Sequence, residues 1–263
     1  MKFATWNVNS LGVRLPQVLE WLSQQAAAGT SVDVLALQEL KLADEKFPVE
    51  AFREAGYHAC WVGQKTYNGV ALISRVPLGA VVRNLPGFAD EQARLITATV
   101  PCAGGDWRVI GGYFPNGQAP GTEKFDYKMR WLDALRMWVA QEMAQHPRLV
   151  LMGDFNITFD DQDVWDPAAL RETIHCTSDE RHQLARLTEL GLVDALRLFP
   201  QPERTHTWWD YRDFAFRRKR GLRIDHILVS AAARCHVKAC GVDVGPRRNE
   251  RPSDHAPVWL LTG

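Results

Sequence analysis

The sequence has no excess charge of either sign and no long apolar segment. Its 31 lysine and arginine residues are matched by 31 acidic residues in a chain of 263. Without an overall positive field, any binding of nucleic acid must depend on local patches. No run of eighteen apolar residues occurs, and the first residues, MKFATWNVNS, lack the apolar stretch of a secretory signal. We therefore expect neither membrane insertion nor secretion, and we expect a cytoplasmic protein.

Cysteine is also scarce, with five residues spread over the whole chain. An odd number of widely separated cysteines is typical of reduced thiols in a cytosolic protein, and not of a disulfide framework. Cys235, His236 and Cys240 lie close together, but no second ligand pair follows at the spacing of a zinc site. The cysteines therefore predict neither disulfides nor a zinc knuckle.

Several motifs of common enzyme classes are missing. No P-loop, no G-x-G-x-x-G after a strand and no serine nucleophile elbow occurs, which argues against nucleoside triphosphatases, dinucleotide enzymes and α/β-hydrolases. No linker rich in serine, glycine and proline divides the chain either. We expect one domain over residues 1–263 and a monomer, since nothing in the sequence indicates an obligate oligomer.

Short apolar runs bounded by turn residues predict strands. They cover residues 3–8, 32–39, 58–63, 69–74, 95–100, 108–114, 148–154, 223–230 and 257–262. Helical spacing of apolar residues predicts helices around 15–22, 129–138 and 184–190. Strands and helices alternate, so the fold class is α/β. The longest irregular segment, residues 155–181, is rich in aspartate, and long loops in compact domains are often functional.

Polar residues interrupt or end four of the predicted strands. A buried charge is costly unless it is paired or bound to a metal. Each residue alone could simply end a strand, but four such positions in one context favour a common site. The residues are Asn7, Glu39, Asp154, Asn156, Asp254 and His255.

This set is rich in oxygen ligands and has no cysteine, which suits Mg²⁺ or Mn²⁺ better than zinc. Such a cation neutralises charge on a phosphoryl group, while an acid or amide positions a water for in-line attack. An imidazole held by a second carboxylate can stabilise the charge that develops on the phosphate, and Asp225 in LRID supplies that carboxylate. The pattern predicts metal-dependent phosphate chemistry.

Nine motifs in order also carry a family resemblance. They are WNVNSL, LALQELK, YNGVALIS, YFPNG, KFDYKMRW, GDFNI, TWWDYR, GLRIDHILVS and RPSDHAPV, and they span nearly the whole chain. Together they resemble the exonuclease III family of DNA-repair nucleases, also called AP endonuclease family 1. The resemblance implies a deoxyribonuclease I-like fold, which is a four-layered αββα sandwich. It further implies a divalent-metal phosphodiesterase that acts on double-stranded DNA.

The resemblance assigns a metal site and a catalytic group to motif positions. Glu39 is implied as the main metal ligand, with Asn7 shaping the site and Asp254 completing it. Asp154 would orient or deprotonate the attacking water, with Asn156 beside it. The residues implied around the metal are Asn7, Glu39, Asp154, Asn156, Asp254 and His255. Some relatives have an acid at the position of Asn9, so the number of bound metal ions stays open.

The resemblance also implies contacts with the phosphate. His255, paired with Asp225, would contact the scissile phosphate. Tyr113 and Asn116 would hold it, and Lys124 would lie near the same backbone. Trp208 borders the position of the pocket for an extruded abasic sugar, so it is either a core residue or a DNA contact. Trp6 and Trp61 are expected in the core.

A basic segment, residues 214–223, is crowded by aromatic residues, which suits phosphate contacts beside a stacking or wedge surface. Its cations are Arg217, Arg218, Lys219, Arg220 and Arg223, and the aromatic residues are Trp208, Trp209, Tyr211, Phe214 and Phe216. A second patch contains Arg247, Arg248 and Arg251. A solvated loop without a partner is the alternative for both.

Two departures from the family pattern bear on substrate choice. Lys219 replaces the asparagine that the family commonly has, and His175 lies where many relatives have a small residue. A bulky imidazole there would leave little room for a flipped-out abasic nucleotide, whereas 3′ groups would still reach the metal. The alternative is that His175 is a surface loop residue without effect.

We therefore expect a 3′-to-5′ exodeoxyribonuclease that also removes 3′ phosphates, acting on duplex DNA with damaged or 3′-blocked ends. Incision at abasic sites is a further activity, reduced by His175, or in the alternative interpretation the main one. Two other hypotheses are a phosphodiesterase for phosphoinositides or sphingomyelin and a catalytically silent DNA-binding protein. The sequence has no membrane-facing amphipathic segment and retains all the expected polar positions, which disfavours both.

Overall fold

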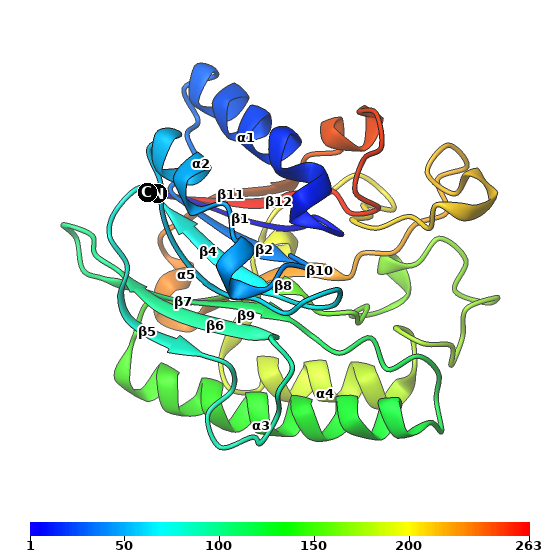
Figure 1. Ribbon diagram of the computed structural model, residues 1–263. Coiled ribbons are helices and arrows are strands. Elements are labelled where there is room, and N and C mark those ends of the chain that lie inside the picture. The colour runs from blue at the N-terminus through cyan, green and yellow to red at the C-terminus, as the bar shows by residue number, and fades with distance from the viewer.

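The structure is a computed structural model that describes residues 1–263. Two six-stranded sheets pack face to face, with helices on both outer surfaces (Figure 1). The first sheet has the order β11-β12-β1-β2-β4-β3. Its strands are β1 (Lys2–Asn7), β2 (Val34–Gln38), β3 (His58–Val62), β4 (Val70–Ser74), β11 (Val237–Val242) and β12 (Val258–Thr262). β1 and β2 are parallel, and the other neighbours in this sheet are antiparallel.

The second sheet has the order β5-β6-β7-β8-β10-β9. Its strands are β5 (Gly79–Arg83), β6 (Leu95–Val100), β7 (Trp107–Tyr113), β8 (Leu149–Asp154), β9 (Leu192–Asp194) and β10 (Asp225–Ser230). β7 and β8 are parallel, and all other pairs are antiparallel. Both sheets are therefore mixed, each with one parallel pair.

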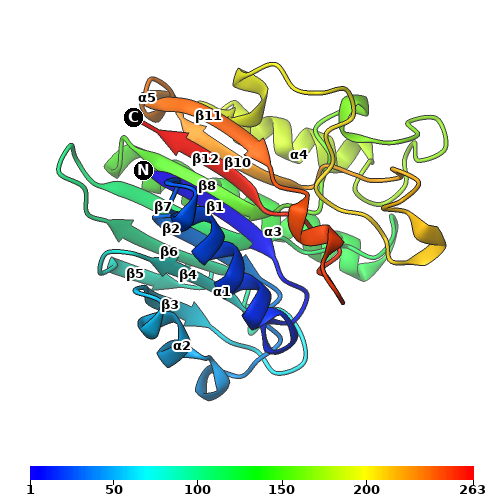
Figure 2. The same ribbon diagram turned by 90° about the horizontal axis from the view of Figure 1, so that it is seen from above.

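Helices cover the two outer faces. α1 (Leu11–Ala27) and α2 (Val49–Glu54) lie on the first sheet, and α3 (Glu123–Gln145) and α4 (Ser178–Thr188) lie on the second (Figures 1 and 2). The short α5 (Ala231–Arg234) follows β10. Single 3-10 turns occur at Asp44–Lys46, Asp161–Asp163, Leu196–Leu198, Arg212–Phe214 and Gly245–Arg248. No helix has the length and apolar character that crossing a membrane would require.

Strand residues alternate between two apolar layers, which explains why the predicted strands read as continuous apolar runs. In β8, Val150 and Met152 face the core between the sheets, whereas Leu149 and Leu151 pack under α3 and α4. In β1, Phe3 faces the central core, and its neighbour Ala4 belongs to the layer beneath α1. The resulting order of helix, sheet, sheet and helix confirms the predicted four-layered sandwich.

All nine predicted strands and all three predicted helices are present, with ends shifted by a few residues. The third helix ends at Thr188 and does not reach Leu190. β5, β9, β11, α2 and α5 were not predicted. β5 and β11 are only partly buried edge strands, and β9 has three residues, so none of the three produces a long apolar run.

Candidate active site

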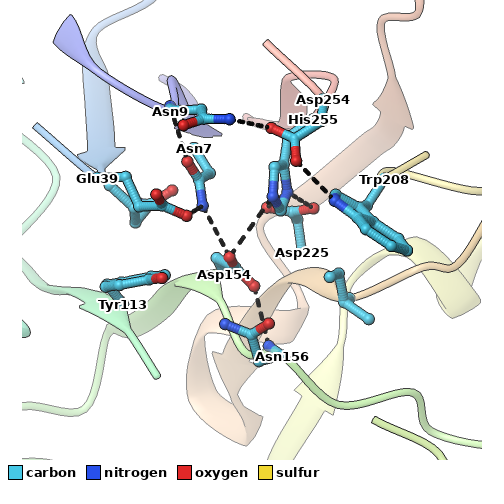
Figure 3. A network of polar contacts seen from close by, with 12 residues as sticks. Asn7, Asn9, Glu39, Tyr113, Asp154, Asn156, Trp208, Asp225, Asp254 and His255 are labelled. Atoms are coloured by element: carbon cyan, nitrogen blue, oxygen red, sulfur yellow. Dashed lines mark hydrogen bonds and ion pairs between the residues drawn. The ribbon is translucent and has the colours of Figure 1, made fainter. Parts of the chain in front are cut away.

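The predicted polar residues meet at one end of the sandwich because of strand register. In the first sheet, Asn7 at the end of β1 pairs with Gln38, which places Asn7 beside Glu39. In the second sheet, Asp154 pairs with Tyr113 on one side and with Asp225 on the other. Face-to-face packing then brings the two groups together, as Figure 3 shows.

Asn7 links the two acids across the sheets. Its Nδ2 donates to Glu39 Oε1 and to Asp154 Oδ2, both at 2.8 Å. Its Oδ1 accepts a hydrogen bond from the backbone N–H of Asn9 at 2.9 Å. The NH₂ group therefore faces the acids. In this arrangement Asn7 orients the carboxylates, and its oxygen is already engaged.

Glu39, Asp154 and His255 each offer a ligand atom, and these atoms lie within 4.8 Å of one another. Asp154 and His255 are buried, whereas Glu39 is half-buried, so the group opens towards solvent on the Glu39 side. Burial raises the pKa of Asp154, against the lowering effect of His255, and the nearby Asp225 carboxylate raises it further. A divalent cation beside these carboxylates would offset that charge crowding. The donor set therefore fits a hard cation.

The other predicted metal ligands have engaged oxygens. Asp254 accepts from Asn9 Nδ2 and from Trp208 Nε1, each at 2.9 Å (Figure 3). Asn156 Oδ1 accepts from Asn116 Nδ2 at 3.3 Å. Asp254 therefore lies at the rim of the site, and it connects the segment around Asn9 to the indole of Trp208.

His255 and Asp225 form the predicted pair. The Nδ1 of His255 donates to Asp225 Oδ2 at 2.9 Å, and its Nε2 lies 3.7 Å from Asp154 Oδ2. Burial acts to lower the pKa of His255, but the carboxylates of Asp225 and Asp154 outweigh it, and the net pKa is raised. The raised pKa favours the doubly protonated ring, whose Nε2 can donate a hydrogen bond to a phosphate oxygen and in that form is not a metal ligand.

Three supporting residues were missed in the sequence analysis. Lys41 Nζ lies 2.9 Å from Glu39 Oε2 and donates to Asn9 Oδ1 at 2.5 Å. Ser253 Oγ donates to the carbonyl of Asn7, which fixes the turn before His255. Thr207 Oγ1 accepts the backbone N–H of Asp225 at 3.1 Å. Lys41 and Ser253 belong to the quoted motifs LALQELK and RPSDHAPV. Their position beside the acids in those motifs could have indicated that they support the site.

The predicted phosphate contacts lie along one side of the site. Burial, reinforced by the carboxylates of Glu39 and Asp154, raises the pKa of Tyr113 well above its ordinary value, so the phenol stays a neutral donor. The side chain of Asn116 is exposed, donates to Asn156 Oδ1 and accepts the backbone N–H of Gln118. Lys124 is exposed and shares with Asn116 a hollow of about 660 Å³. Lys124 is the most open of the three, since the phenol of Tyr113 is half-buried and hydrogen-bonded to Glu39 and the amide of Asn116 is engaged by its neighbours.

His175 is not the surface residue of the alternative interpretation, because only 7% of it is exposed. Its Nδ1 donates to the carbonyl of Asn156 at 2.7 Å, and its ring centroid lies 6.4 Å from that of half-buried Trp208. Burial lowers the pKa of His175 to about 4, so the ring is neutral. Its φ of +72° is in the region that glycine adopts most easily. His175 therefore lies in the wall beside the site, in a backbone conformation that suits a smaller residue.

The basic segment is only partly as predicted. Arg217, Arg218, Lys219 and Arg220 are all exposed, with Arg217 stacked on Phe214 at 5.1 Å. We call residues 214–220 the basic loop. The prediction for Arg223 was wrong. Its guanidinium is buried and binds Asp163 at 2.6 Å and Asp194 at 2.8 Å.

The predictions for Arg247 and Trp61 also need correction. Arg247 is buried over the ring of Phe216 and donates to the carbonyl of Ser253, so it supports the turn before His255 and is not a surface cation. Arg248 and Arg251 remain exposed. Trp6 is fully buried as expected, whereas Trp61 is half-buried and stacks on Phe47 with ring centroids 4.4 Å apart.

Comparison with known proteins identifies similar sequences and folds. Residues 4–255 match the profile described as the Endonuclease/Exonuclease/phosphatase family. Exodeoxyribonuclease III of Haemophilus influenzae is 38% identical over 270 residues, covering 98% of both chains. The exodeoxyribonuclease of Bacillus subtilis is 30% identical and covers 99% of both.

Two solved structures cover the whole chain and 99% of their own. One is the 3′ phosphatase NExo from Neisseria bound to a product DNA hairpin, with a TM-score of 0.93 and 49% identity. The other is an AP endonuclease from Archaeoglobus fulgidus, with a TM-score of 0.92 and 34% identity. The fold and the sequence thus agree on the same group of relatives.

Proposed function

The chain belongs to the endonuclease/exonuclease/phosphatase family, and from that premise we propose that it is a DNA-repair phosphodiesterase of exodeoxyribonuclease III type. It trims 3′ ends of duplex DNA and removes 3′ phosphates, with Mg²⁺ or Mn²⁺ as cofactor. The observation that carries the proposal is the convergence of Glu39, Asp154 and His255 within 4.8 Å, with Asp225 behind the imidazole. The similarity to a Neisseria 3′-5′ exonuclease and 3′ phosphatase supports the substrate class.

Glu39 and Asp154 would hold the cation, which when bound neutralises phosphate charge and stabilises the departing oxygen. Asp154 orients the attacking water and takes its proton, and the backbone N–H of Asn156 fixes that carboxylate at 2.9 Å from Oδ1. His255 donates from Nε2 to a phosphate oxygen while Asp225 holds the other ring nitrogen. The neutral phenol of Tyr113 supplies a further donor from the opposite side.

One active site serves both reactions, because each breaks a P–O bond at a 3′ end and only the position of the substrate changes. All of the site residues come from a single chain, so the proposal needs no second copy. We also propose a cytoplasmic protein, where its five unpaired cysteines would stay reduced.

His175 narrows the wall beside the metal site, and we propose that it favours terminal 3′ groups over an extruded abasic nucleotide. The alternative, that abasic-site incision is the main activity, is supported by the similarity to an AP endonuclease. The two proposals differ in the effect that they predict for a smaller residue at position 175. A glycine at position 175 would also relieve the positive φ, so a control variant must separate that effect from the effect of the added space.

His175→Gly is expected to raise internal abasic-site incision relative to 3′-phosphate removal by roughly tenfold, since it removes a bulky group from the pocket wall. Both rates are measured on duplexes of matched sequence. Glu172→Gly is the control, because Glu172 has a φ of +55° in the same segment but is exposed. If the ratio does not rise for His175→Gly, or rises equally for both variants, the proposed role of His175 is wrong.

The basic loop would hold the DNA backbone. Arg217→Ala is expected to reduce the slope of log K against log salt by about one unit, since one phosphate contact is lost. Arg53→Ala serves as a control, because Arg53 is an exposed arginine on α2, paired with Glu50. Anisotropy titrations of a labelled duplex at several salt concentrations measure the slope. Equal slopes for wild type and Arg217→Ala would argue against this interface.

Lipid headgroups are the competing substrate class. Parallel assays with duplex DNA and with vesicles containing phosphoinositides or sphingomyelin test the proposal. Release of nucleotides or phosphate from DNA alone is expected. Turnover only on vesicles would favour the lipid hypothesis, and no turnover on either would favour a silent DNA-binding protein.

A further inference from the structure

A fully buried lysine lies behind the segment that carries Asn156. Lys128, on α3, has no exposed surface. A lysine ammonium has three donors, and here all three are used. They bind the carboxylate of Glu180, the carbonyl of Asn156 at 2.8 Å and the carbonyl of Asn116 at 3.2 Å. Lys128 therefore ties two site segments to the start of α4 and has no donor left for a substrate.

The contact with Asn156 bears directly on the reacting group. Asn156 has a φ of +52°, a conformation that persists only when its surroundings hold it. Its carbonyl accepts from Lys128 and from His175, while its N–H donates to Asp154 Oδ1 at 2.9 Å. The orientation of the Asp154 carboxylate therefore depends on how this residue is held.

The contact with the carbonyl of Asn116 is longer, at 3.2 Å, but the stem of the lysine adds to it. The stem of Lys128 passes against Gly117, where an added Cβ would lie 2.9 Å from Lys128 Cδ at a φ of +87°. A glycine is required for the chain to lie on the lysine there. The side chain of Asn116 then reaches Asn156 Oδ1 at 3.3 Å. One buried ammonium thus sets the positions of both amides.

A buried ion pair is weak evidence for stability, because such a pair can often be replaced by apolar residues without loss of stability. A second buried pair provides a comparison on the same helix. Arg108 pairs with Glu142 of α3, and both are nearly as buried as Lys128 and Glu180. Arg108 otherwise binds the carbonyl of Ala80 and the hydroxyl of Thr99. It contacts no residue of the site.

We propose that Lys128, held by Glu180, is a positioning residue for phosphodiester hydrolysis. It acts through Asn156 and Asn116 and does not touch the substrate. The proposal rests on the proposed function, because it concerns the turnover of that reaction. Loss of the pair should therefore affect kcat, through misplaced catalytic groups, more than KM.

The test compares two double variants on a 3′-phosphorylated duplex. Lys128→Met with Glu180→Gln removes both charges of the proposed pair, and Arg108→Met with Glu142→Gln does the same at the control pair. The first is expected to lower kcat by about 100-fold, as for a displacement of about 1 Å in the site, and to leave KM within about twofold. The second should leave kcat within about twofold, even if its melting temperature falls as much.

Equal kcat values for the two double variants would overturn the proposal. Should the first variant fail to fold, Glu180→Gln alone retains Lys128 and the cap formed with Thr177, and it should lower kcat at unchanged KM. Unchanged kcat in that variant would also overturn it. Wild-type protein is assayed alongside. No phosphate release by wild type would refute the proposed function, whereas an active wild type with unaffected variants would refute only the role of Lys128.

Discussion

Asp154→Asn is expected to lower turnover by about 10³-fold, within the range that a general base contributes. Asparagine has nearly the same shape, but it cannot take a proton from water and carries no charge for a cation. The variant also loses one acceptor for the amide of Asn7. Affinity for DNA should change little, because Asp154 is buried and the DNA backbone is proposed to bind the exposed cations of the basic loop.

Single-turnover release of phosphate measures the first effect, and fluorescence anisotropy with the same duplex measures the second. Asp161→Asn is the matched control, since Asp161 is an exposed carboxylate paired with Arg181. Turnover of Asp154→Asn within about tenfold of wild type would exclude the group as the general base.

Glu39→Gln should have the second large effect, on the cation. One carboxylate oxygen of Glu39 accepts from Asn7 and the other pairs with Lys41, so its position is fixed before a cation binds. Even partners that only orient metal ligands contribute about 10–100-fold to affinity. Loss of the charged ligand itself should therefore weaken binding of Mn²⁺ by about 100-fold or more.

Calorimetric titration of Mn²⁺ into the protein without DNA measures this affinity independently of activity. Glu45→Gln is the control, because Glu45 is an exposed carboxylate close by in the sequence. Similar Mn²⁺ affinities in Glu39→Gln and wild type would remove Glu39 from the metal site.

Much of the site was predictable because its residues mark strand ends. Asn7 ends β1 and Glu39 directly follows its parallel neighbour β2, so their proximity follows from register. Asp154 and Tyr113 end the other parallel pair in the same way. Short apolar runs that end in a polar residue therefore predicted both the strands of the fold and the residues at the centre of the site.

The errors arose where a long-range partner decides burial. Arg223 belongs to a basic run that resembles a solvated surface, but its partners Asp163 and Asp194 lie 60 and 29 positions away. For His175 the sequence left two alternatives open, and the hydrogen bond from its imidazole to the carbonyl of Asn156 decides against the surface one. Lys128 lies in the quoted motif KFDYKMRW, but its partner Glu180 is on another helix, so the sequence did not indicate its burial. Local composition does not show such pairs.

The central claim is that a cation held at Glu39 and Asp154 enables this protein to hydrolyse P–O bonds at the 3′ ends of duplex DNA. The most direct test measures release of inorganic phosphate from a 3′-phosphorylated duplex by wild-type protein, first with Mg²⁺, then with excess chelator, and again after Mg²⁺ is restored. We predict release with Mg²⁺, none with chelator, and full recovery on restoration. Release that persists in the chelator, or no release with either Mg²⁺ or Mn²⁺, would contradict the account.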